Sequence, residues 1–123
     1  RACLEQVMTP RAYEHMLAMA ERLEDGLERL IEQESLPWNV QRVGARLEVG
    51  FTSAPPRTGR QSVEALPRLL PDAIRLYLLN RGLVITPFHN MMLLSPVTPA
   101  AAVDRLAICW AECVRELTGA ARH

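Results

Sequence analysis

One stripe of apolar residues constrains this chain more than any other feature of its sequence. The stripe follows Thr9-Pro10 at steps of four and three, and its members are Met16, Ala20, Leu23, Leu27 and Leu30. Because an α-helix repeats every 3.6 residues, this spacing predicts a long amphipathic helix with one buried face. Thr9 can cap the free backbone N–H groups and Pro10 suits the first helical position, so the helix starts there. Pro37 sets its end.

The two segments that follow predict a β-hairpin, with strands at 38–43 and 46–52 joined at Gly44-Ala45. In the second strand, apolar side chains alternate with polar or small ones, and the apolar set is Leu47, Val49 and Phe51. This period of two is typical of a strand with one buried face, which we expect to lie on the first helix. Residues 53–61 contain prolines and a glycine, and their composition predicts a surface loop.

The middle of the chain predicts a second helix and a pair of strands. The helix covers 73–81, with Pro71 in its first turn and Gly82 as its left-handed stop. Three short segments without a helical period come next: a strand at 83–86, a turn at 87–90 and a strand at 91–95.

A last helix begins at Thr98-Pro99 and is predicted to end at Gly119. Its apolar side consists of Val103, Leu106, Ala107, Trp110, Val114 and Leu117.

The order of elements predicts an α+β fold, in which three helices pack on one face of a small, mainly antiparallel sheet of four strands. A length of 123 residues fits one core, so residues 1–123 are expected to form a single domain.

Charge and hydropathy narrow the classes of partner. The 14 basic residues balance 14 acidic ones, so no net positive charge favours nucleic acid. The apolar runs are too short and too interrupted to span a bilayer, and we expect no membrane partner. No signal peptide is visible at the start, and we expect a cytoplasmic protein.

All 14 basic residues are arginine, which has a chemical consequence. Without lysine, no Schiff base to a side-chain amine can form within this chain. The chain opens without an initiator methionine, on a segment (residues 1–8) that has the character of a helix already under way. This opening predicts a piece of a longer protein; a processed mature chain would open in the same way.

Cysteine and histidine offer few candidates for chemistry. Cys109 and Cys113 are four residues apart, so they could be buried thiols or half of a metal site. No second pair stands at ligand spacing, and we interpret them as structural thiols with no metal site. His15 and His123 are interpreted as surface or boundary residues. His89 lies in a turn, where binding groups are common, but no carboxylate is near it in sequence, so we favour a non-catalytic role.

Several segments, in order, resemble the C-terminal part of class III aminotransferases. They are LEQVMTPRAYEHM at 4–16, VQRVGAR at 40–46, FT at 51–52, LLNRGL at 78–83 and LSP at 94–96, followed by the final helix. The resemblance covers nearly the whole chain. The branch it is similar to contains glutamate-1-semialdehyde aminomutase and the transaminases of β-amino acids.

This resemblance implies a homodimeric fold type I enzyme that uses pyridoxal 5′-phosphate, with this chain as its C-terminal small domain. A large domain upstream would carry the cofactor lysine, the carboxylate that pairs with the pyridine nitrogen and most phosphate contacts. We therefore expect no catalytic and no cofactor-binding residue in this chain. By the same resemblance, one loop lies at the entrance for a small amino acid or amine substrate, and its members are Thr86, Phe88, His89, Asn90 and Met91.

One position departs from part of the family. The acetylornithine, ornithine and GABA transaminases carry an arginine in the strand after this loop, and the matching residue here is Leu93. A bidentate clamp for a substrate carboxylate is therefore absent at that position. Carboxylate recognition is left to Arg81, to residues upstream, or to none.

The resemblance favours a transaminase that moves an amino group from an amino acid or amine to a keto or aldehyde acceptor. The second hypothesis is an aminomutase of the glutamate-1-semialdehyde type, which moves the group within one molecule. A third is a protein-interaction module without catalysis, since the chain contains no complete catalytic set. In the first two cases we expect the 123-residue chain alone to be inactive and to self-associate through exposed apolar surface.

Overall fold

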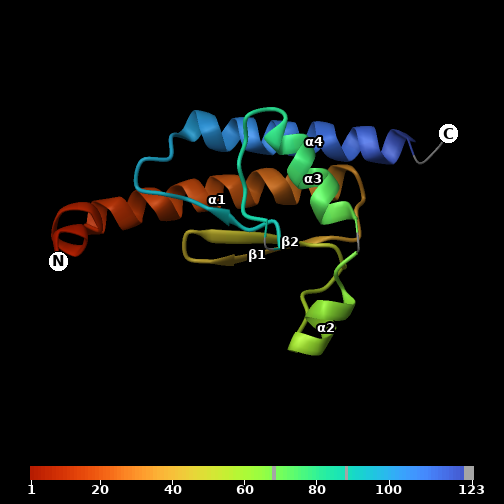
Figure 1. Cartoon of the computed structure of the whole chain (residues 1–123), viewed down its shortest axis with the longest axis horizontal. Coiled ribbons are helices and arrows are strands. Elements are labelled where there is room, and N and C mark those ends of the chain that lie inside the picture. The colour runs from red at the N-terminus through yellow and green to blue at the C-terminus, as the bar shows by residue number, and fades with distance from the viewer. Residues whose placement is uncertain (68, 88, 121–123) are drawn as a thin grey trace.

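Helix α1 (Pro10–Gln33) is the longest element of the computed structural model, which describes residues 1–67, 69–87 and 89–120 (Figure 1). The Thr9 hydroxyl accepts a hydrogen bond from the Ala12 backbone N–H at 3.3 Å, so the predicted cap is confirmed. The five residues of the stripe are all buried, and the stripe is therefore the inner face of the helix. A short π-helix, η1 (Cys3–Val7), precedes it, where a helical segment was predicted.

The predicted hairpin is confirmed as β1 (Asn39–Val43) and β2 (Arg46–Gly50), which pair antiparallel. Gly44 takes φ +60° in the connecting turn, a left-handed conformation that glycine adopts without steric cost. The third strand, β3 (Met92–Leu93), pairs antiparallel with β2, giving the order β1-β2-β3. Leu47 and Val49 point into the core, whereas Arg46 and Glu48 lie on the opposite, outer face of the sheet.

The prediction of a four-strand sheet was wrong, since the described residues form a sheet of three strands. Residues 83–86 are extended but pair with no strand, and 91–95 shortens to β3. Leu83 and Ile85 pack against the helical core, while Val84 between them is exposed. The apolar character of this segment thus reflects packing on helices rather than a place in the sheet.

Helix boundaries differ from prediction in three places. Helix α3 (Leu70–Leu79) begins and ends earlier than 73–81, although Gly82 does take the left-handed conformation expected of a stop (φ +74°). Part of the predicted 53–61 loop belongs to α2 (Gly59–Glu64), because the Thr58 hydroxyl accepts the Gln61 backbone N–H and starts a helical turn. Helix α4 (Ala100–Ala120) continues through Gly119, which stays outside the left-handed region.

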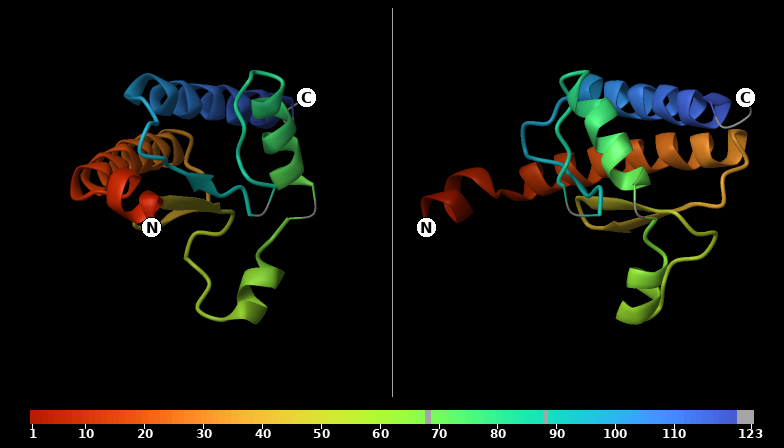
Figure 2. Two further views of the ribbon diagram at one scale, coloured as in Figure 1. Left: turned by 60° about the vertical axis from the view of Figure 1, so that its left-hand side comes forward. Right: turned by 45° about the vertical axis from the view of Figure 1, so that its right-hand side comes forward.

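The elements stack in layers, with α1 between the sheet on one side and α4 on the other (Figures 1 and 2). Helix α3 packs on α4, and α2 projects from the far side of the sheet as a separate arm. The α+β class and the placement of the large helices on one face of a small antiparallel sheet are confirmed.

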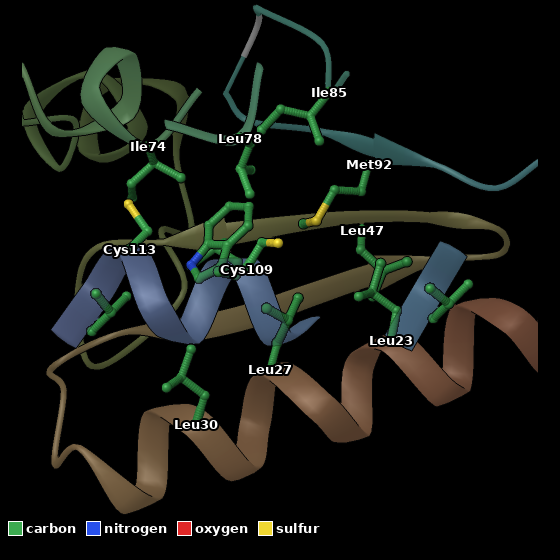
Figure 3. Close-up of a cluster of buried hydrophobic side chains, with 14 of the residues drawn as sticks. Leu23, Leu27, Leu30, Leu47, Ile74, Leu78, Ile85, Met92, Cys109 and Cys113 are labelled. Atoms are coloured by element: carbon green, nitrogen blue, oxygen red, sulfur yellow. The ribbon is translucent and has the colours of Figure 1, made fainter. Parts of the chain in front are cut away.

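The core draws side chains from every layer. Leu23, Leu27 and Leu30 point from α1 into the same interior as Leu47 and Met92 of the sheet (Figure 3). Trp110 of α4 is fully buried and is the largest side chain in this cluster. Helices α1 and α4 approach closely, since a Cβ added at Gly26 would lie 3.1 Å from the Ala107 Cβ. Glycine at this crossing thus allows the two helices to pack closely, and a larger residue would require Ala107 to shift by a few tenths of an ångström.

Two leucines on α1 allow a matched test of this packing. Leu27 is 1% exposed and Leu17 is 42% exposed. Leu27→Ala should lower the free energy of unfolding by about 2–5 kcal/mol, because it removes a core side chain and leaves a cavity. Leu17→Ala should change it by less than about 1 kcal/mol. Urea unfolding followed by circular dichroism measures both, and equal losses would contradict the assignment of the buried face.

Candidate functional site

The loop predicted to lie at a substrate entrance is a tight turn that meets the outer face of the sheet. The Thr86 backbone N–H donates to the Met91 carbonyl at 3.1 Å and closes the base of the turn. His89 and Asn90 at its tip have φ +52° and +50°, in the left-handed region that non-glycine residues rarely adopt. Phe88, the remaining member of the predicted set, lies outside the described residues.

Asn90 holds the turn from beneath. Its side chain is 1% exposed, and it is the one polar residue buried in the described core. Its Nδ2 has no acceptor within the described part of the chain. A buried donor without an acceptor costs about 1–3 kcal/mol. Asn90 is therefore enclosed by the core and is not presented to solvent.

His89 is held by a carboxylate from the hairpin. Its Nδ1 lies 3.2 Å from Oε1 of Glu48, whose Oε2 accepts a hydrogen bond from the Arg46 guanidinium, also at 3.2 Å. A neutral imidazole that donates Nδ1–H to this carboxylate presents Nε2 as an acceptor. Glu48 thus orients the ring and selects its tautomer.

Glu48 is the functional residue that sequence reasoning missed. The alternating pattern of β2 does place it on the face opposite Leu47 and Val49, together with Gln41, its cross-strand partner. No local pattern shows that the 86–91 turn folds back onto this face. The pair is a product of tertiary structure.

His89 of the loop, the sheet and the α2 arm line a small, partly open cavity of about 20 Å³. The polar side chains around it are Gln41, Glu48, Thr52, Ser62 and His89. A volume of this size holds about one water molecule. By itself this cavity can order a water beside His89, but it cannot enclose an amino acid.

The two positions linked to carboxylate recognition lie elsewhere. Leu93 is 61% exposed on β3, opposite Arg46. Arg81 stacks over the Tyr77 ring at 3.4 Å and lies within 3.5 Å of Glu116 and 4.0 Å of Glu112. Its charge is therefore already compensated by α4, so Arg81 is a weak candidate for holding a substrate carboxylate.

The remaining polar candidates have structural surroundings. Cys109 and Cys113 are buried, as their interpretation as structural thiols requires. Burial, with a smaller contribution from Glu116, raises the pKa of Cys113 to about 11. His15 is half-buried and its Nε2 lies 2.8 Å from the Thr98 carbonyl, which confirms a boundary position. His123 lies outside the described residues.

The described ranges offer neither a metal site nor a membrane span. Nowhere in residues 1–67, 69–87 and 89–120 do three His, Cys, Asp or Glu side chains gather as metal ligands would. Within the same ranges, none of the helices combines the length and apolarity needed to cross a bilayer.

Comparison with known proteins gives a consistent picture. The chain matches no family model and no curated protein. Among solved structures, it is similar to a glutamate-1-semialdehyde aminomutase from Pseudomonas aeruginosa PAO1 solved with PMP, at 43% identity and a TM-score of 0.92 over 95% of this chain. It is also similar to a β-phenylalanine aminotransferase from Variovorax paradoxus, at 22% identity and a TM-score of 0.75 over 97% of this chain. An ω-transaminase from Sphaerobacter thermophilus matches 88% of it, at 18% identity and a TM-score of 0.74.

Over nearly its whole length the chain has the fold of one part of these solved enzymes. With the aminomutase the likeness extends to the sequence, whereas the two transaminases share the fold alone, and the resemblance seen in the sequence is thereby confirmed. The chain spans about a quarter of each of these relatives: 26% of the aminomutase, 27% of the β-phenylalanine aminotransferase and 25% of the ω-transaminase.

Removing the carboxylate that holds His89 should loosen the turn. Glu48→Ala should speed amide hydrogen exchange at residues 89–91 about two- to fivefold, because a partly exposed contact between a side-chain donor and a carboxylate contributes about 0.5–1 kcal/mol. Glu64→Ala, which breaks the exposed pair with Arg60 on α2, is the matched control and should leave this exchange unchanged. Unchanged exchange in Glu48→Ala would contradict the anchoring role.

Thiol reactivity tests the burial of α4. With a folded-state pKa of about 11 against an ordinary 9.0, Cys113 stays protonated near pH 8 and should resist iodoacetamide, whereas exposed Cys3 should react. Because the folded state holds this proton more tightly, its contribution to stability is complete below pH 9 and is lost as pH rises through about 11. Mass spectrometry of alkylated peptides reads out the protection. Equal labelling of Cys3 and Cys113 at pH 8 would contradict it.

Proposed function

We propose that this domain belongs to a pyridoxal-phosphate-dependent aminotransferase and forms a wall of its substrate entrance. The observation that carries the proposal is the 43% identity to an aminomutase of this enzyme class across 95% of the chain. In that enzyme an amino group would pass from an amino acid or amine to a keto or aldehyde acceptor. The role given to the 86–91 turn agrees with its position on a rigid sheet, where binding groups are held in place.

The residues of this chain do not form a binding site for pyridoxal phosphate. Every basic residue is arginine, so no lysine can form the covalent link to the cofactor. The cavity beside His89 has a volume of about 20 Å³, which holds about one water molecule rather than a cofactor. We therefore assign cofactor binding to a large domain carried by the same longer polypeptide, and we assign no reaction step to this chain.

Exposed apolar side chains support a partner that covers this domain. Val43, Leu69 and Val97 are each more than three-quarters exposed: 77%, 79% and 85%. Apolar surface of this kind is commonly covered by another domain or subunit. The large domain and the second subunit of a homodimer are the partners we propose. The alternative of an independent interaction module is not favoured, because it leaves the agreement with the aminomutase unexplained.

A second candidate function is an aminomutase that moves the amino group within one molecule. The observation in its favour is that two structures of the Pseudomonas aeruginosa aminomutase agree with this chain at 43% and 42% identity, well above the two named transaminases. The agreement concerns a domain that does not hold the cofactor. It leaves the choice between the two reactions to experiment.

An assay with separate substrates distinguishes the two reactions. The full-length protein, incubated with an amino donor and a keto or aldehyde acceptor, should form the aminated acceptor in proportion to the deaminated donor. Isomerisation of a single amino-aldehyde without net transfer would favour the aminomutase. The 123-residue chain alone should give neither product. If the full-length protein binds no pyridoxal phosphate and forms neither product, the proposal is wrong.

A further inference from the structure

A second hollow lies on the other side of the 86–91 turn, away from the cavity beside His89. It is an open groove of about 190 Å³, and its apolar walls are Leu79, Leu83, Val84, Ile85 and Pro87. An apolar cavity of about 150 Å³ accommodates benzene, so a branched or aromatic side chain would fit in this groove. Pro87 belongs to the turn itself, so the groove opens beside the proposed entrance.

One charged residue, Arg75 of α3, lines this apolar groove. Its side chain is 30% exposed, and its Nε is buried with no acceptor among the described residues. The guanidinium makes one polar contact there, a hydrogen bond from Nη2 to Asp72 at 3.3 Å. Asp72 is 63% exposed, so water screens its charge. Arg75 thus carries a positive charge whose hydrogen-bonding capacity is largely unused.

A guanidinium whose donors are incompletely used binds a carboxylate through charge-assisted hydrogen bonds. The groove beside it favours an apolar substituent on the same molecule. We propose that Arg75 and this groove bind an amino acid with an apolar side chain, with its carboxylate on Arg75 and its side chain against Leu79, Val84 and Pro87. This inference rests on the proposed function, and it makes Arg75 a specificity-determining residue for the amino donor.

Asp72 provides a second test, because its carboxylate competes with a bound carboxylate for the guanidinium of Arg75. Removing the charge of Arg75 and removing the charge of Asp72 should therefore change the affinity for the acid in opposite directions. Arg75→Met keeps the length of the side chain and its preference for a helix but removes the charge, so it should weaken binding of the acid. Asp72→Asn frees Nη2 and removes a repulsive charge, so it should strengthen binding. A merely structural ion pair would be weakened by both changes.

The kinetic test compares donors that differ only in the carboxylate. In the full-length enzyme, Arg75→Met should raise KM at least about tenfold for β-phenylalanine, which reflects loss of a charge-assisted hydrogen bond. KM for 1-phenylethylamine, which has the same ring and amine without the carboxylate, should stay within about twofold. Leucine and 3-methylbutylamine form a second pair. Arg60→Met, which breaks an exposed i,i+4 pair on α2, is the matched control and should change neither value.

A binding measurement is independent of turnover. By calorimetry, 3-phenylpropanoate should bind the full-length protein, 3-phenylpropanamide should bind at least about tenfold more weakly, and Arg75→Met should abolish the difference. Asp72→Asn should tighten binding of the acid about 1.5- to twofold. If amino transfer occurs but Arg75→Met leaves both KM and binding of the acid unchanged, the site is wrong and the proposed function stands. If the acid binds through Arg75 but no donor reacts, the site stands and the proposed function is wrong.

Discussion

The arrangement depends on one helix face, the buried stripe of α1, which packs against the sheet on one side and α4 on the other. The close crossing at Gly26 and Ala107 brings α4 near enough for Trp110 to be sealed in the core. With α4 fixed, α3 packs on it and the chain returns through 83–91 to the edge of β2. This packing positions the 86–91 turn, its contact with Glu48 and the groove at Arg75.

The two sides of the 86–91 turn differ in chemistry because different layers form them. Toward the sheet, Glu48 orients His89 beside a polar cavity that has room for about one water. Toward α3, the walls are apolar and Arg75 contributes one charge. A wall of this kind can position a substrate and exclude solvent, but without lysine it cannot hold the cofactor. The proposed enzyme class requires a lysine, and this chain has none. The two facts are compatible if the reactive lysine belongs to another part of a longer polypeptide.

Local chemistry made much of the fold predictable. The α1 stripe, the Thr9 cap and the turn at Gly44 each follow from a few neighbouring residues, and each is confirmed. Two expectations failed for different reasons. The apolar segment 83–86 packs on the helical core instead of joining the sheet. Helix α4 continues through Gly119, because that residue does not take the left-handed conformation of a helix stop. The turn was identified as a candidate site through family resemblance. Its partner Glu48 is distant from it in sequence, and no local pattern could have indicated that contact. The groove at Arg75 is formed within residues 75–87, but it exists only because the chain turns back after α3.

The central claim is that this domain shapes a pyridoxal-phosphate site whose lysine lies outside these 123 residues. Borohydride reduction fixes the cofactor to the lysine that holds it, and peptide mapping of the reduced full-length protein then locates that residue. The account predicts one modified lysine in a peptide that precedes Arg1. A full-length protein that retains no cofactor after reduction, or that contains no lysine to modify, would contradict it.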